Sequence, residues 1–220
     1  MGKGILAIWH DVAEHAVAEV GHWYNSEHHP ERLAVPGFLA ARRHRAVSET
    51  PLLFVIYDVE DVEVLASKPY LDRVNAPTEW TSRCMPHFRN NSRTVFRVAE
   101  RMGQGAGVQV ATLRIGREAQ DDALLSSRVT TLMREFMTKP GSVSAEYWRA
   151  DAARTAIQTE ERRLRGDPDF VENCALVITS SDPELVAASA RNAAASLLDW
   201  GLRSVEVGLY EMEFTLFVSQ

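Results

Sequence analysis

The segment from Trp23 to Phe38 concentrates side chains that can transfer protons or line an aromatic pocket. Two aromatic residues open it, and the triplet Glu27-His28-His29 follows after two small polar residues. An imidazole changes its charge near neutral pH, which suits it to general acid–base catalysis. No other stretch of the 220 residues holds so many reactive side chains. We therefore take this segment as the candidate site.

His28 is the predicted general base. It follows Tyr24 by four residues and Val20 by eight, so on a helix it continues a buried stripe toward a pocket between helix and sheet. The alternative is a buried histidine that is bonded to a backbone carbonyl. His29 is turned by about 100° from His28 and is expected to meet solvent or to cap the helix end.

Two charged residues are expected to act beside His28. Glu27 either orients an imidazole or forms a structural salt bridge with Arg43, since many perturbed carboxylates are only structural. Either Arg43 or Tyr57 is expected to hold an oxygen of the substrate. Glu27, His28 and Arg43 are thus the predicted catalytic residues.

The predicted substrate-binding residues are aromatic or imidazole side chains, because ligand pockets are mostly apolar with few polar groups. Aromatic residues at helical spacing suit a hydrophobic core equally well. The set consists of Trp23, Tyr24, Tyr57, Trp80 and His87.

A metal centre is not expected. His15, His22 and His29 recur every seven residues, but seven residues of helix rise about 10.5 Å, too far for ligands of one ion. The pair Glu27-His28 also lacks the His-Glu-x-x-His spacing of zinc hydrolases. We predict neither a metal nor a bound cofactor.

Composition narrows the partners and the location. The net charge of −6 argues against a nucleic-acid partner, and no apolar run approaches the roughly 18 residues of a membrane span. The N-terminus lacks the pattern of a signal peptide. Cys84 and Cys174 lie in apolar segments far apart and are expected to be reduced, buried thiols of a cytoplasmic protein.

The elements that position the site alternate between strands and helices. In the first half, alternation and helical spacing predict the order β-α-β-β-α-β, the ferredoxin-like unit. Pro30 is expected to end the first helix, and a short hairpin connection is expected at 48–51. The predicted segments are strand 4–11, helix 13–29, strand 38–47, strand 52–59, a broken helical region 61–88 and strand 93–100.

The same order returns after a glycine-rich stretch at 102–107, which is read as a linker because a strand follows it and not a helix. The predicted segments are strand 107–115, helix 121–138, strand 142–150, helical turns within 152–165, strand 173–180, helix 183–200 and strand 203–218. We predict an internal duplication with a period of about 105 residues: an N-terminal repeat at 1–101 that carries the site, and a C-terminal repeat at 107–220 that is scaffold. All seven histidines lie in the first.

Both faces of several strands are apolar, so both faces must be covered. Strand 52–59 shows this, with Leu53, Val55 and Tyr57 on one face and Phe54 and Ile56 on the other. Helices cover one face, and the sheet of the other repeat is the natural cover for the second. The predicted fold class is therefore α+β: two tandem ferredoxin-like repeats whose antiparallel sheets pack face to face as an α+β barrel within one chain.

With this architecture in view, the N-terminal half resembles the EthD-like proteins of the dimeric α+β barrel superfamily. The likeness rests on Trp23–Pro30, on Val35-Pro36-Gly37-Phe38 and on the arginines of the next strand, and it covers about residues 4–100. That superfamily includes cofactor-free monooxygenases, a lactone isomerase, polyketide cyclases and haem enzymes. The resemblance therefore implies the fold and does not settle the reaction.

Three functions stay open at this stage. The first is a cofactor-free enzyme that acts on a hydrophobic aromatic or polyketide-like small molecule by histidine-assisted proton transfer, as an isomerase, cyclase, dehydratase or monooxygenase. The second is a non-catalytic binding or accessory protein. The third is a haem enzyme, which would need an axial ligand from the first half or a tyrosine such as Tyr147, since the second half holds no histidine. A homodimer of such barrels stays open as well.

Overall fold

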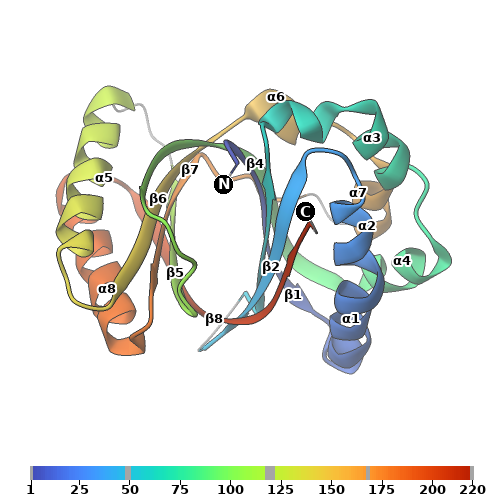
Figure 1. The fold of residues 1–220 in the computed structure, drawn as a ribbon, viewed down its shortest axis with the longest axis horizontal. Helices are drawn as coiled ribbons and strands as arrows, with labels where there is room; N and C mark the ends of the chain where they lie inside the picture. The colour runs from blue at the N-terminus through green and yellow to red at the C-terminus, as the bar shows by residue number, and fades with distance from the viewer. Residues whose placement is uncertain (1, 48–50, 117–121, 167–168, 219–220) are drawn as a thin grey trace.

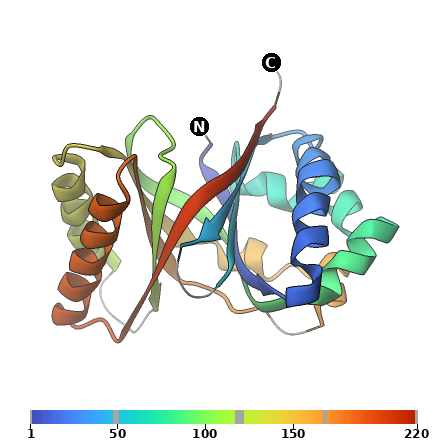
Figure 2. The same cartoon turned by 90° about the horizontal axis from the view of Figure 1, so that it is seen from below.

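The computed structural model describes residues 2–47, 51–116, 122–166 and 169–218. Within these residues the chain is α+β, and its eight antiparallel strands close into one barrel in the order β1-β3-β2-β8-β5-β7-β6-β4. Helices flank the barrel on two opposite sides, as both views show (Figure 1, Figure 2). The predicted fold class is confirmed, while the hairpin connection expected at 48–51 lies mostly outside the described residues.

The first sheet contains β1 (Gly4–Val12), β2 (Phe38–Ala46), β3 (Leu53–Val59) and part of β4 (Phe88–Gly103). Its outer face is covered by four helices: α1 (Val17–Trp23), α2 (His29–Leu33), α3 (Lys68–Val74) and α4 (Glu79–Cys84). Short 3-10 turns at 14–16, 62–66 and 85–87 complete this layer.

The second sheet contains β5 (Gln109–Gly116), β6 (Ser142–Ala150), β7 (Cys174–Ser180) and part of β8 (Ser204–Phe217). Two long helices, α5 (Asp122–Met137) and α8 (Pro183–Asp199), cover it. Asp182 caps α8 by accepting from the backbone N–H groups of Glu184 and Leu185, as its sequence Asp-Pro predicts.

Two long strands join the sheets. Strand β4 pairs with β1 through residues 88–97 and with β6 through residues 96–103. Strand β8 pairs with β5 through residues 204–211 and with β2 through residues 210–217. Because each of these strands belongs to both sheets, the barrel has no open edge among the described strands, and β4 is longer than predicted.

Alternate residues of the strands face the helices or the barrel interior, and both sets are buried in β1, β3 and β7, whereas most of β8 is exposed or half-buried. On β3, Val55 and Tyr57 join the core beneath α1, whereas Phe54 and Ile56 join the core inside the barrel. The interior is filled by stacked rings, with Trp9 and Phe54 at 4.8 Å between centroids. The prediction that both faces are covered is therefore confirmed.

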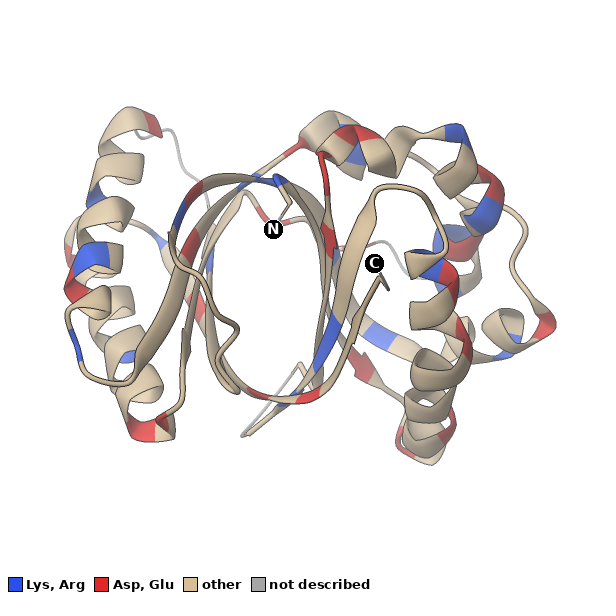
Figure 3. Ribbon diagram, in the orientation of Figure 1, with Lys and Arg blue, Asp and Glu red and all other residues tan. Residues whose placement is uncertain are grey.

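Strand β2 carries a basic cluster, residues 42–45, whose side chains point alternately to the two faces of the sheet, as expected for a strand. Arg42 and His44 line a small cavity at the barrel mouth, and Arg42 pairs with Asp58 inside the barrel. Arg43 and Arg45 face the other way, and both pair with Glu213 of β8. Acidic and basic residues are interspersed over the outer helices as well (Figure 3).

The connection between β6 and β7 crosses onto the first half of the molecule. It carries the short helices α6 (Ala152–Thr155) and α7 (Glu160–Arg165). The hydroxyl of Thr155 accepts from the backbone N–H of Val95 at 3.0 Å. In Figure 1, α6 and α7 lie among the helices of the first half, away from α5 and α8. Part of the second half of the sequence is thus built into the first half's helical layer.

A tight turn before β2 depends on Gly37. Its φ of +91° is unfavourable for a side chain, and an added Cβ would lie 2.6 Å from Cγ2 of Val64. Replacing Gly37 by Ala is expected to lower the free energy of unfolding by about 1–2 kcal/mol or more. Urea unfolding measures the loss. Gly21→Ala is the control, because nothing lies within 4 Å of its Cβ and a helical Gly→Ala change should stabilise; equal effects of the two would contradict the prediction.

Candidate functional site

The helix that carries the predicted site contains an irregular turn. A π-helical turn at Tyr24–His28 separates α1 from α2, and the helix continues through Pro30 to Leu33. The prediction that Pro30 ends the helix is wrong: Pro30 occupies the first turn of α2, where a missing backbone N–H is tolerated. Single π-helical turns are uncommon and are frequently found at functional sites.

His29 is buried, with 0% of its surface exposed, so the prediction that it meets solvent or caps the helix end is wrong. Two features explain the difference. The 100° step of a regular α-helix does not apply across the π-helical turn. Phe214 of β8 also stacks on the imidazole at 5.2 Å between ring centroids, covering it from the far end of the sequence.

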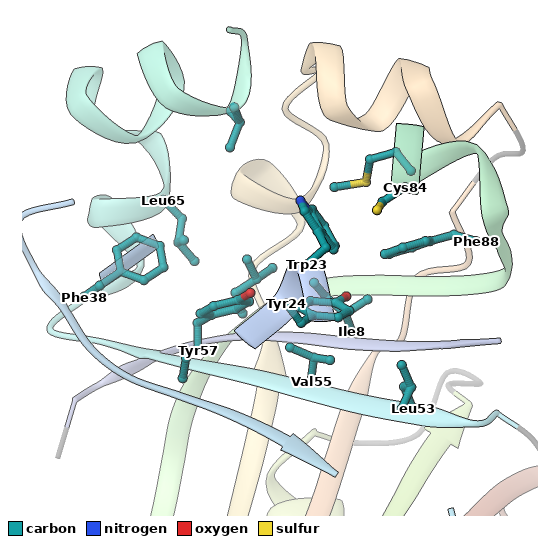
Figure 4. Close-up of a cluster of buried hydrophobic side chains, with 14 of the residues drawn as sticks. Ile8, Trp23, Tyr24, Phe38, Leu53, Val55, Tyr57, Leu65, Cys84 and Phe88 are labelled. Carbon is teal, nitrogen blue, oxygen red and sulfur yellow. The ribbon is translucent and has the colours of Figure 1, made fainter. Parts of the chain in front are cut away.

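Two histidine–tyrosine pairs lie beneath the helix. The Nε2 atom of His10 lies 3.0 Å from the hydroxyl of Tyr24, and Nδ1 of His29 lies 3.0 Å from the hydroxyl of Tyr57. Each pair joins one residue of the helix to one of the sheet. Figure 4 shows Tyr24 and Tyr57 between the helix of Trp23 and the strand of Val55.

His28 lies between these two pairs. Its ring centroid is 4.2 Å from that of Trp23, 5.5 Å from that of Tyr24 and 6.3 Å from that of Tyr57. The side chain is 4% exposed, and its Nδ1 atom is buried with no hydrogen-bond partner among the described residues. The structure therefore brings the predicted base together with three of the five predicted binding residues.

Burial keeps these groups neutral. Desolvation, followed by the charge of Arg32, lowers the pKa of His28 well below its ordinary value. Desolvation and Arg43 lower the pKa of His29 to about 3, and desolvation lowers that of His10 to about 4. Burial raises the pKa values of the Tyr24 and Tyr57 hydroxyls. At neutral pH the cluster consists of imidazoles and phenols without charge, in which proton positions are set by hydrogen bonding.

Arg43 reaches the cluster from β2. Its guanidinium carbon lies 5.7 Å from the centre of the Tyr24 ring, while its Nη1 atom donates to Oδ1 of Asn25 at 2.8 Å. Among the described contacts Arg43 pairs with Glu213 of β8 at 3.2 Å, in place of the predicted Glu27–Arg43 pair. A fixed cation is thus held beside a tyrosine of the site.

Glu27 faces a different set of groups. Its Oε1 atom accepts hydrogen bonds from the Trp23 indole at 3.2 Å, from the Thr78 hydroxyl at 2.6 Å and from the Thr81 hydroxyl at 3.3 Å. These contacts fasten the site helix to α4. The position suits a residue that orients Trp23, against which His28 packs.

Trp80 and His87 lie toward the exposed side of the helix. The ring centroid of Trp80 is 5.1 Å from that of His22, and the ring centroid of His87 is 4.9 Å from that of His15. Both partner histidines are exposed. Among the described residues, no ring contact joins Trp80 or His87 to the His28 cluster, so these two predicted residues are not brought to it.

Arg32 and Glu161 form a buried ion pair at the end of the site. The sequence analysis did not predict this ion pair. Arg32 follows His28 by four residues on the helix, and Glu161 belongs to α7. Arg32 is 1% and Glu161 is 7% exposed. Burial alone would lower the pKa of Arg32, but the charge of Glu161 and the neighbouring tyrosines raise it, so Arg32 stays a cation. His10 was also missed, although its alternation with Leu6 and Ile8 on one strand face was visible.

The cluster is almost fully buried, with His28 4% and Tyr57 0% exposed. Four pockets lined by described residues lie elsewhere, and none of these four has His28, Tyr57 or Trp80 in its wall. The largest, about 510 Å³, lies between α5 and α8. A second, of about 410 Å³, lies at a barrel mouth beside Asp11 and Arg114.

Three general properties complete the description. Within the described ranges no group of three or more His, Cys, Asp or Glu side chains is arranged to hold a metal ion. Cys84 and Cys174 are buried and form no disulfide, as predicted. None of the helices in the described part of the chain is long and apolar enough to span a membrane.

Comparison with known proteins places the fold. No protein-family model matches the chain, and no curated protein matches its sequence. Among solved structures, a protein described provisionally as a monooxygenase, from Fusobacterium nucleatum, is 8% identical with a TM-score of 0.62, over 98% of this chain and 95% of that one. An anthrone oxidase-like protein is 11% identical with a TM-score of 0.63, over 99% and 93%. A haem-binding protein from Thermus thermophilus is 8% identical with a TM-score of 0.52, over 97% and 92%.

These likenesses concern the fold alone, because the identities are low. They agree in fold with this chain, which is α+β with a closed barrel of eight antiparallel strands.

Proposed function

We propose that this protein is a small-molecule enzyme in which His28 removes a proton from a hydrophobic aromatic or polyketide-like substrate without a bound cofactor. One observation carries the proposal. His28 is buried and neutral, its Nδ1 atom has no partner among the described residues, and it lies between two tyrosines that are each bonded to another histidine. A neutral imidazole with a free nitrogen is the form that accepts a proton.

The step leaves an anion on the substrate and a cation on His28, and the surroundings favour the first of these charges and oppose the second. Proton removal leaves an anion on the substrate, and Arg32 and Arg43 supply fixed positive charge nearby. The hydroxyl of Tyr57, already bonded to His29, is placed to hold an oxygen of the substrate. Isomerisation, cyclisation, dehydration and oxygenation all begin with or include such a proton transfer. The monooxygenase and anthrone oxidase-like names of the comparison proteins favour oxygenation among them.

The alternatives are supported less well. The haem-binding comparison protein raises the haem reading again, but Tyr147 does not fit as an axial ligand, because it is 3% exposed and lies in the apolar core between the second sheet and its helices. The ligand would have to come from the first half. A purely binding role is compatible with the same paired histidines and tyrosines, and the exchange experiment below distinguishes it from catalysis. We also propose that the chain is EthD-like, that residues 1–101 hold the site and 107–220 are scaffold, and that the protein is cytoplasmic and able to form a homodimer.

The test is hydrogen exchange at the acidic carbon of anthrone, an aromatic ketone, followed by NMR in D2O. The wild-type protein is expected to accelerate exchange, and His28→Ala is expected to reduce the catalysed rate by about 10²–10⁴-fold, the usual contribution of a general base. His22→Ala, an exposed histidine on the same helix, is the matched control and should leave the rate unchanged. An acceleration that His28→Ala does not reduce would refute the role of His28, and no acceleration by the wild type would count against this substrate class.

A further inference from the structure

The largest of the four pockets lined by described residues lies in the second half of the chain, between α5 and α8. Its volume of about 510 Å³ is within the range of small-molecule sites. A smaller pocket of about 100 Å³ adjoins it, because Asn192 and Ser196 line both. Figure 1 shows α5 and α8 together on the side of the barrel away from α1 and α2. We call the two pockets together the α5–α8 groove.

The larger pocket is lined by polar and charged side chains from both helices. On α8, Asn192, Ser196 and Trp200 follow one another at four-residue spacing, so they share one face of the helix, and Asp199 lies beside them. Arg128 of α5 approaches this face, and its Nη2 atom donates to Oγ of Ser196. The pocket therefore has a cation on one helix and a carboxylate on the other.

These two charges are not used within the described structure. The hydrogen bond to Ser196 is the one contact that the guanidinium of Arg128 makes with described residues, and its Nε atom has no partner there. The carboxylate of Asp199 is exposed and forms neither a hydrogen bond nor a salt bridge with any described residue. Opposite charges that border one pocket without pairing leave room for a ligand that carries both charges. A ligand with a single charge would pair with one of them and face repulsion from the other.

The smaller pocket is apolar at its base. It reaches the second sheet between the helices, at two residues of β7 that are almost fully buried. Its apolar lining consists of Leu132, Phe136, Leu176, Ile178 and Ala193. A volume of about 100 Å³ suits a branched aliphatic group, and removing such a group from water favours binding.

From this arrangement we infer that the α5–α8 groove binds an α-amino acid with an aliphatic side chain. Arg128 binds the carboxylate, because the N–H groups of arginine match the oxygen atoms of a carboxylate. Asp199 binds the ammonium group, and the smaller pocket receives the side chain. An α-amino acid carries both charges on one carbon atom, beside the side chain. The inference gives a ligand site to the half that the proposed function treats as scaffold, and it does not depend on His28.

The test is calorimetric titration of the full chain with L-leucine and three analogues, each of which lacks one part of it. The analogue 4-methylpentanoate lacks the ammonium group, 3-methylbutylamine lacks the carboxylate, and glycine lacks the side chain. L-leucine is expected to bind at least about fivefold more tightly than each analogue, because each loses a charged hydrogen-bonding group or the apolar contact.

Variants assign each preference to one residue. Asp199→Asn should remove the preference for L-leucine over 4-methylpentanoate, and Arg128→Met should remove the preference over 3-methylbutylamine. Arg134→Met changes an exposed arginine of α5 outside the groove and should keep every preference. Thermal unfolding confirms that each variant is folded. No detectable binding of L-leucine by the wild type, or preferences that persist in Asp199→Asn and Arg128→Met, would overturn the inference.

Discussion

Acidification from pH 7 to pH 5 is expected to lower the free energy of unfolding by roughly 6–8 kcal/mol. Four buried histidines have lowered pKa values in the folded state: His10 at about 4, His29 and His44 at about 3, and His28 well below 6.5. Below pH 6.5 the unfolded chain binds protons that the folded protein does not. The contribution of these histidines to the free energy of unfolding is therefore complete above pH 6.5 and is lost progressively until the pH falls to about 3–4. At pH 5 each histidine has lowered the free energy of unfolding by about 2 kcal/mol.

Urea unfolding at pH 7, 6 and 5 measures this dependence. His44→Phe keeps a ring against Phe54 inside the barrel and should reduce the slope by about one proton, or about 1.4 kcal/mol per pH unit. His22→Ala, on the exposed side of the helix, should leave the slope unchanged. A free energy of unfolding that is flat between pH 7 and pH 5 would show that these imidazoles are not neutral in the folded protein.

Removing Glu161 alone is expected to cost more than removing the whole ion pair. Glu161→Ala leaves the Arg32 cation buried without a partner, and breaking a buried pair in this way typically costs about 3–5 kcal/mol. Arg32→Met/Glu161→Met replaces both charges by apolar side chains of similar length, a change that is often neutral or stabilising. The double variant should therefore be more stable than the single one, although it differs from the wild type at more positions.

Thermal and urea unfolding of both variants measure this difference. Lys68→Ala is the matched control, because the Lys68–Asp72 pair is exposed and exposed pairs contribute at most about 1 kcal/mol. If Glu161→Ala were no less stable than Lys68→Ala, Arg32 would not be held in the dry environment that the structure shows.

Much of the fold could be predicted because it follows from local patterns. Apolar residues on both faces of strands such as 52–59 require two covers, and this requirement led to the barrel. The long β4 strand was underestimated because residues 89–92 and Arg101 carry polar side chains, and the strand pairing of both ends depends on partners in both sheets. The continuation of the helix through Pro30 was missed because proline was expected to end the helix. In the first turn of α2 its missing backbone N–H is tolerated.

The site was predictable in part for the same reason. Trp23, Tyr24 and His28 follow one helical stripe, and Tyr57 lies on the strand face below it. Arg32 and Glu161 lie 129 residues apart, and no local pattern indicates that α7 returns to the first half. The burial of His29 likewise depends on Phe214, which only barrel closure brings to it. Sequence patterns therefore predicted the contacts within elements and missed those that depend on closure.

The closing position of β8 has a consequence for the growing polypeptide. Strand β2 pairs with residues 210–217, so its second edge stays unpaired until those residues have been synthesised. An unpaired edge is a template for aggregation, and charged side chains are a common protection. Arg42, Arg43 and Arg45 lie on β2, and Glu213 of β8 pairs with two of them in the folded barrel. Before β8 is in place, we expect these arginines to oppose pairing between the exposed edges of two nascent chains.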